Sequence, residues 1–237
     1  MIWYDRRMIW SFKMIWSFNM RLFIAVSIAT FTVNCFPAFA QDKPPLRILS
    51  MVSLDLDGNG KTDHVAAVLN GAGTNPEKRD DGSYWLQDGE TVDLYFYMDS
   101  GENELQLSRI PSFIKRNVLD SETTTAVSPL AVTGKASVRL DSCNGCGASI
   151  STAESLTIVS RGGELLVGGF KRNWDENVHL ANAEVETTTG ECDINFLTGR
   201  GFASADVTQQ PKPLNHKFRP VKLADWTRKK FPKACRG

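Results

Sequence analysis

The chain has 237 residues, with 27 basic and 27 acidic side chains, 42% hydrophobic residues and five cysteines. This composition is that of a globular protein and excludes a fibrous or intrinsically disordered chain. The sequence contains no His-Glu-x-x-His, Gly-x-Ser-x-Gly or Walker-type phosphate loop, so we assign no catalytic residue from motifs.

The first forty residues differ in composition from the rest, because they hold six of the 13 phenylalanines and no glycine. Met20-Arg21, an apolar run over 22–33 and Ala38-Phe39-Ala40 are typical of a secretory signal peptide, so we predict cleavage after Ala40. The apolar run is shorter than the roughly 20 residues that span a bilayer. Within 1–19 the triplet Met-Ile-Trp occurs three times, which indicates a mis-annotated extension with Met20 as the true start.

The mature chain, 41–237, is therefore expected in the periplasm or outside the cell, as a single β-rich domain without a transmembrane anchor. Its C-terminal tail, 212–237, carries nine basic residues against the single acid Asp225. The tail either binds an anionic envelope polymer or docks on the acidic body of the same chain. We favour docking within the chain, and we expect no nucleic-acid partner.

Most apolar segments of the mature chain are short, β-branched or aromatic, and bounded by turn-forming residues, which is typical of strands. We predict strands at about 46–54, 62–69, 91–99, 104–110, 130–141, 155–160, 164–173, 182–188 and 192–198. The expected fold is mainly β: an antiparallel meander, sandwich- or barrel-like, closed by a short C-terminal helix near 222–231.

Three segments predict turns or loops. Arg161-Gly162-Gly163 predicts a hairpin turn, and Thr189-Gly190 predicts a second turn before the strand at Cys192. Residues 71–89 predict a long mobile loop. The stretch 190–201 places Arg200 between two glycines, which indicates a tight turn, with a binding role as the alternative.

The clearest motif is Asp55-Leu56-Asp57-Gly58-Asn59-Gly60-Lys61-Thr62-Asp63, between two predicted strands. The side-chain oxygens of Asp55, Asp57 and Asn59 alternate and can turn inward together, Asp63 adds a third carboxylate, and Lys61 would contribute its backbone carbonyl. Hard oxygen ligands in this number favour structural Ca²⁺ over Zn²⁺ or Cu²⁺. The alternative is a hairpin whose Asp, Asn and Gly residues merely favour turns.

This loop resembles the Asp-x-(Asp/Asn)-Gly-(Asp/Asn)-Gly-x-x-Asp loop of FG-GAP and VCBS-type repeats, which joins two strands and binds calcium. The resemblance covers about 54–69 and occurs once, whereas those families build propellers from several repeats. It implies calcium ligation by Asp55, Asp57, Asn59 and Asp63, and it implies no propeller for the chain as a whole.

Four cysteines remain after cleavage: Cys143, Cys146, Cys192 and Cys235. An even number in an exported chain predicts two disulfides, with three connectivities open. We favour Cys143 with Cys146, and Cys192 with Cys235. The alternative role of the Cys143/Cys146 pair is thiol–disulfide exchange, but the residues that follow it predict a strand rather than the helix that usually lowers the thiol pKa.

The sequence favours a non-enzymatic exported β-domain that acts by binding. The first alternative is an envelope hydrolase using acidic residues near the metal, with Asp175, Glu176 and Asp193 as candidate acids. The second alternative is a thiol–disulfide oxidoreductase. His64, His179 and His216 lie in no metal or nucleophile motif, and we expect each to be a surface or hydrogen-bonded histidine.

Overall fold

The structure, a computed structural model, describes residues 46–71, 77–100, 110–179, 185–204, 210–228 and 235. By its internal contacts the chain divides into two units, Met1–Lys43 and Pro44–Gly237, and all described residues belong to the second. Among the described residues no helix has the length and apolar character needed to cross a bilayer.

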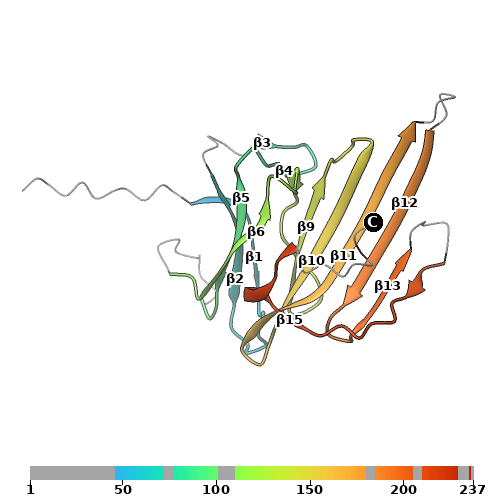
Figure 1. The fold of residues 1–237 in the computed structure, drawn as a ribbon. Coiled ribbons are helices and arrows are strands. Elements are labelled where there is room, and N and C mark those ends of the chain that lie inside the picture. Colours follow the sequence, from blue (N-terminus) through green and yellow to red (C-terminus); the bar gives the residue numbers. More distant parts are fainter. Residues whose placement is uncertain are drawn as a thin grey trace, which may run out of the picture. The chain divides into compact units, whose positions relative to one another are not determined.

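The described chain is built from antiparallel strands in two sheets, which confirms the mainly β prediction (Figure 1). The smaller sheet has the order β1-β2-β5-β6, and the larger has the order β14-β13-β12-β11-β10-β9-β7-β4-β3, with β15 on β11 and β8 on β9. The strands are β1 (Arg47–Leu54), β2 (Asp63–Asn70), β3 (Glu77–Lys78), β4 (Tyr84–Trp85), β5 (Thr91–Tyr97), β6 (Phe113–Asp120), β7 (Ala126–Val127), β8 (Ala131–Val132), β9 (Ser137–Asn144), β10 (Ile150–Arg161), β11 (Glu164–His179), β12 (Val185–Asn195), β13 (Arg200–Ser204), β14 (Lys212–Pro213) and β15 (Val221–Lys222).

The two sheets share one hydrophobic core, so the arrangement is sandwich-like. Val65, Leu94 and Phe96 of the smaller sheet and Ile158 and Ile194 of the larger belong to the same buried cluster. On β2, residues alternate between this core and a second cluster on the other face of the smaller sheet. Burial of both faces explains the continuous apolar runs at 65–69 of β2 and 94–97 of β5.

The hairpin predicted at Arg161-Gly162-Gly163 is present and joins the long strands β10 and β11 (Figure 1). Gly162 and Gly163 have φ values of 59° and 78°, the left-handed conformation that a two-residue hairpin turn requires. The sequence prediction missed β6 and β13. It also missed five strands of two residues each, namely β3, β4, β7, β14 and β15.

The prediction of a turn at Thr189-Gly190 is wrong. Residues 185–188 and 192–195, which were predicted in two different strands, belong to the single strand β12. Strand β12 runs unbroken through Gly190, which pairs with Trp174 of β11. A Cβ atom on residue 190 would lie 2.1 Å from Trp174 Cζ2, so the glycine makes room for the indole ring across the sheet. Beyond Asn195 the chain turns into β13, and the turn lies at 196–199.

The strand predicted at 130–141 is two strands, because a turn at Gly134 folds β8 back on β9. Gly134 has a φ of 68°, which breaks the extended conformation. The loop predicted over 71–89 contains a short hairpin, in which β3 pairs with β4 and β4 continues to β7. The strand predicted at 104–110 falls almost entirely outside the described residues.

The helix predicted at 222–231 is a single 3-10 turn, η1 (Leu223–Asp225), within the part of that segment that is described. Its residues are held by tertiary contacts rather than by helical periodicity. Leu223 and Trp226 are buried in the core, and Lys115 Nζ of β6 donates to the carbonyls of Ala224 and Trp226 at 3.1 and 2.6 Å.

The described part of the basic tail contacts the body of its own chain. Arg228 pairs with Glu154 of β10, and Lys222 pairs with Glu164 of β11. Cys235 forms a disulfide with Cys192 of β12, with a Cα–Cα distance of 5.3 Å. The two ion pairs neutralise part of the tail's positive charge, and the disulfide attaches the tail to β12.

Candidate functional site

The acidic loop joins β1 to β2, whose last pair is Leu54 with Asp63. Gly58 and Gly60 have φ values of 78° and 84°, and these left-handed residues let the backbone curl back on itself. The loop is therefore a tight excursion at the end of two paired strands, and Asp63 is both its last residue and the first residue of β2.

Three carboxylates of this loop converge. One oxygen from each of Asp55, Asp57 and Asp63 lies within 4.8 Å of the other two. Asp63 is fully buried, Asp55 is half-buried and Asp57 is exposed. This group of carboxylates is therefore buried at Asp63 and exposed to solvent at Asp57.

Backbone N–H groups orient the two inner carboxylates. Asp55 accepts hydrogen bonds from the amides of Gly58, Asn59 and Gly60 at 2.8 to 3.0 Å. Asp63 accepts from Leu56 N through one oxygen and from Asp99 N through the other, both at 2.8 Å. Each carboxylate oxygen has two acceptor sites, so these bonds fix the side chains and leave capacity for a further ligand.

Asn59 and Lys61 form further contacts within the loop and with Asp99. The Asn59 amide nitrogen donates to Asp57 at 3.1 Å and to Asp99 at 2.6 Å, and its oxygen accepts from Lys61 N at 2.8 Å. Lys61 Nζ lies 3.4 Å from the Asp99 carboxylate. The structure therefore brings together Asp55, Asp57 and Asp63, while Asn59 and Lys61 connect the loop to Asp99.

Asp99 is the residue that sequence reasoning missed. It follows β5, has a φ of 52° and reaches the loop from 36 residues beyond Asp63. Because β5 pairs with β2, the end of β5 lies beside the loop. A non-glycine residue in the left-handed conformation is uncommon, and here it turns the chain so that Asp99 N donates to Asp63.

The donor set fits a hard divalent cation. It consists of carboxylate oxygens only, which suit Ca²⁺ and Mg²⁺ better than metals that prefer nitrogen or sulfur ligands. The oxygens come from one short loop with fixed backbone geometry, and Asp99 adds a fourth carboxylate at its edge. The arrangement can hold a cation and would relieve the repulsion among the acids.

A cleft of about 420 Å³ adjoins this loop, and Asp57 is one of its lining residues. Its apolar lining includes Met98, which directly follows β5, Phe113 of β6 in the smaller sheet and Leu165 of β11 in the larger sheet. Glu164 and Lys222, which form an ion pair, also line this cleft. Hydrogen bonding to Glu164 raises the pKa of Lys222, which keeps this amine charged.

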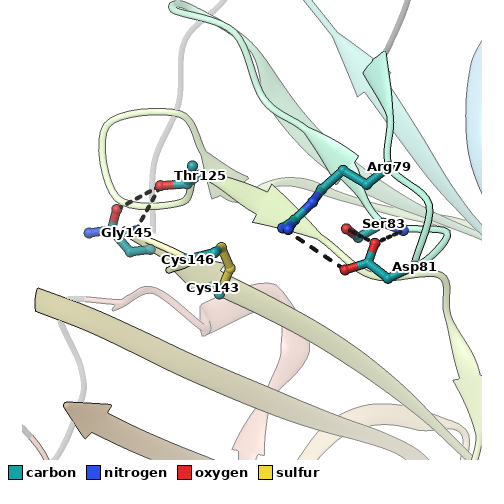
Figure 2. The surroundings of a disulfide bond; sticks show 8 residues. Arg79, Asp81, Ser83, Thr125, Cys143, Gly145 and Cys146 are labelled. Atoms are coloured by element: carbon teal, nitrogen blue, oxygen red, sulfur yellow. Dashed lines mark hydrogen bonds and ion pairs between the residues drawn. A yellow bond between two sulfur atoms is a disulfide. The ribbon is translucent and has the colours of Figure 1, made fainter. Parts of the chain in front are cut away.

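The Cys143–Cys146 disulfide lies at the end of β9, with a Cα–Cα distance of 5.8 Å (Figure 2). Gly145 has a φ of 62°, and its amide donates to Thr125 Oγ1 at 2.9 Å, which holds the turn between the cysteines. Figure 2 also shows Asp81 accepting from Ser83, and these bonds lower the pKa of Asp81. The pair leads into strand β10 and not into a helix, so no helix N-terminus is available to activate a thiol.

The acids proposed for a hydrolase do not meet. Asp193 of β12 pairs with Lys171, whereas Asp175 of β11 pairs with Thr189, four residues further along the ladder. At about 3.3 Å per residue this separates their backbones by roughly 13 Å. Glu176 follows Asp175 and therefore points to the opposite face of the sheet.

Two of the three histidines can be placed. His64 is buried on β2, and its Nδ1 lies 2.7 Å from Ser53 Oγ. His216 is exposed, with its ring 5.0 Å from that of Phe218. The side chain of His179 lies outside the described part of the chain.

Comparison of the chain with protein-family models, with characterised proteins and with solved structures found no match.

Proposed function

We propose that the chain is an exported, non-enzymatic β-domain that acts by binding and is stabilised by one calcium ion held in the loop from Asp55 to Asp63. The observation that supports this proposal is the convergence of three carboxylates within 4.8 Å on a loop whose backbone amides already orient them. Like charges at this distance repel, and a bound cation turns that repulsion into attraction.

The position of Asp57 extends the proposal from stability to binding. Asp57 belongs both to the carboxylate group and to the lining of the cleft of about 420 Å³. A cation held by Asp55, Asp57 and Asp63 fixes the Asp57 side chain and thereby one wall of the cleft. A ligand that occupies this cleft would then bind more tightly when calcium is present.

The calcium proposal is tested by thermal unfolding of the purified protein in excess EGTA and across a calcium titration. Calcium at about a hundred times its dissociation constant adds roughly 2.7 kcal/mol to the free energy of unfolding, which raises the midpoint by about 5 to 10 °C for a domain of this size. In Asp57→Asn the shift is expected to vanish or to need at least about tenfold more calcium.

The matched control is Asp81→Asn. Asp81 is also an exposed aspartate that caps a turn, through Ser83, and it lies outside the carboxylate group. Its calcium shift should equal that of the unmodified protein. The absence of any shift at millimolar calcium, or an equal shift in Asp57→Asn, would reduce the loop to a hairpin turn.

The non-enzymatic part of the proposal has a separate test. Envelope polysaccharides and esters are screened for turnover with the unmodified protein, Asp175→Asn and Asp193→Asn. Binding without turnover supports a binding domain. Turnover that either variant loses would establish the hydrolase alternative instead.

A further inference from the structure

A second and larger cavity lies on the face of the larger sheet that points away from the core. Cys192, Ile194 and Phe196 are buried, so Asp193 and Asn195 between them point to the opposite face. In the antiparallel ladder Phe202 pairs with Asp193, and Arg200 pairs with Asn195. These four side chains therefore share that face, and all four line a cavity of about 720 Å³.

Another wall of this cavity is the segment 213–217, which begins beside β13, where Pro213 pairs with Phe202. Two glycines let this segment approach the β12–β13 turn closely. Gly199 has a φ of 72°, and a Cβ atom there would lie 2.9 Å from the carbonyl oxygen of Phe218. A Cβ atom on Gly201 would lie 3.0 Å from Phe218 Cε2. Phe218 is buried and packs against Phe196 with ring centroids 6.1 Å apart. The wall is thus anchored in the core and not loosely attached.

The cavity combines an apolar surface with uncompensated positive charge. Phe202, Pro213 and Leu214 supply the apolar part of the lining. Arg200 and Lys217 are exposed at its edge, and neither forms an ion pair with any described residue.

The acid in the cavity does not neutralise these cations. Asp193 is half-buried and is faced by Lys171, its partner on β11, while Glu191 lies two residues away on its own strand. Burial raises the pKa of Asp193. Among the described residues, the charged groups that line the cavity are Asp193, Arg200 and Lys217, with His216 as a further titratable group. Lys171 and Glu191 act on Asp193 from β11 and β12, and Lys212 lies on the adjacent strand β14.

We propose that this cavity binds a small organic carboxylate, with its apolar body on Phe202, Pro213 and Leu214 and its carboxylate between Arg200 and Lys217. A cavity of this volume is in the range that holds small-molecule ligands. A neutral polyol would leave both cations unpaired, whereas a cationic ligand would meet like charge. The site is separate from the acidic loop and does not depend on calcium.

The test compares three probes that share one apolar body: octanoate, octanol and octylammonium. Binding is measured by calorimetry on the full exported protein in EGTA, so that the calcium proposal plays no part. Octanoate is expected to bind at least about tenfold more tightly than octylammonium, with octanol in between. Arg200→Gln and Lys217→Gln should each weaken octanoate about two- to fivefold and leave octanol unchanged, as expected for partly exposed charges.

The matched control is Arg219→Gln, because Arg219 is an exposed cation two residues beyond Lys217 that does not line the cavity. It should leave octanoate affinity unchanged. Phe202→Ser should weaken all three probes, and unchanged thermal midpoints of the Gln variants show that they are folded. Failure of octanoate to bind, equal affinity for the three probes, or an equal loss in Arg219→Gln would overturn the proposal.

Discussion

Asp63 connects three segments of the smaller sheet through one side chain. Its two oxygens accept from Leu56 N in the loop and from Asp99 N after β5, while its own backbone begins β2. A fully buried carboxylate is costly unless its oxygens are hydrogen-bonded. The two backbone donors meet that requirement, and the loop keeps its conformation through these bonds.

At the residue scale, Gly190 gives the clearest prediction for stability. Gly190→Ala places a Cβ atom 2.1 Å from the Trp174 ring, so the indole or the strand must shift. We expect a loss of about 1 to 3 kcal/mol in the free energy of unfolding, as for an overpacked core. Chemical denaturation of the variant measures it.

Gly169→Ala is the control for this prediction. Gly169 also lies within a strand, but its nearest neighbours to an added Cβ are Ile194 O at 3.4 Å and Thr157 Cβ at 3.7 Å, which are ordinary contacts. Its loss should be clearly smaller. Equal losses in the two variants would show that the Trp174 ring does not restrict residue 190.

These residues also show what local sequence can reveal. The spacing of Asp55, Asp57 and Asp63 predicts their convergence, because all three lie on one short loop. Asp99 and Trp174 enter through strand pairing. Trp174 pairs with Gly190, and the pairing of β5 with β2 brings Asp99, just beyond the end of β5, to the loop. No local pattern encodes which residue will pair with which, so Gly190 reads as a turn until its partner is known.

At the scale of elements, the C-terminal segment acts as a strap across both sheets. Strand β15 pairs with β11, Trp226 packs against Phe170 with centroids 5.8 Å apart, and Lys115 of the smaller sheet binds the carbonyls of Ala224 and Trp226. The described part of this segment, 221–228 and Cys235, is short and includes the 3-10 turn η1, so its stability comes from these contacts and from the disulfide to Cys192.

The two disulfides are expected to contribute unequally. Cys192–Cys235 closes a sequence separation of 43 residues, and Cys143–Cys146 closes one of 3. In the loop-entropy model the longer bridge is worth about 4 kcal/mol and the shorter about 2 kcal/mol.

Paired Cys→Ser variants test this order by denaturant unfolding. The Cys192/Cys235 variant should also be cleaved sooner by protease in the C-terminal segment, because the strap is released. Equal losses in the two paired variants, or a larger loss for Cys143/Cys146, would contradict the model.

The elements differ in how well the sequence predicts them. Long strands with regular alternation, such as β10 and β11, were found, although their ends extend further than expected. The segment 130–141 was misread because Ala131, Val132, Val138 and Leu140 are apolar on both sides of Gly134. Strands of two residues are too short to carry a period. Strands β7, β8, β14 and β15 pair with longer strands, whereas β3 and β4 extend the edge of the larger sheet through β7.

At the scale of the whole molecule, the sequence predicts the β class but not the choice between sandwich and barrel. That choice depends on whether the first and last strands of a sheet pair, which is a non-local property. The described strands form two sheets, and in neither of them do the first and last strands of the order pair with each other. The two sheets share one hydrophobic core. The excess positive charge of the tail is partly paired within the chain, through Glu154 and Glu164.

The proposed export gives a prediction for the entire chain. Translation from Met20 and cleavage after Ala40 should yield a mature protein that begins at Gln41. Mass spectrometry of the protein from the cell envelope and culture medium measures this terminus. Replacement of Ala40 by Arg should block cleavage, and a protein that retains 1–40 without this change would contradict the prediction.

Because Cys192 pairs with Cys235, molecules that contain Cys235 and molecules that lack it differ in their number of free thiols. Any copy that stops before residue 235 leaves Cys192 without its partner, and it also lacks the backbone carbonyl to which Arg172 donates at 2.9 Å. Such a copy carries an unpaired Cys192 thiol among the residues of the hydrophobic core. Truncated molecules would thus be distinguished from those with the Cys192–Cys235 bridge by a free-thiol count after unfolding.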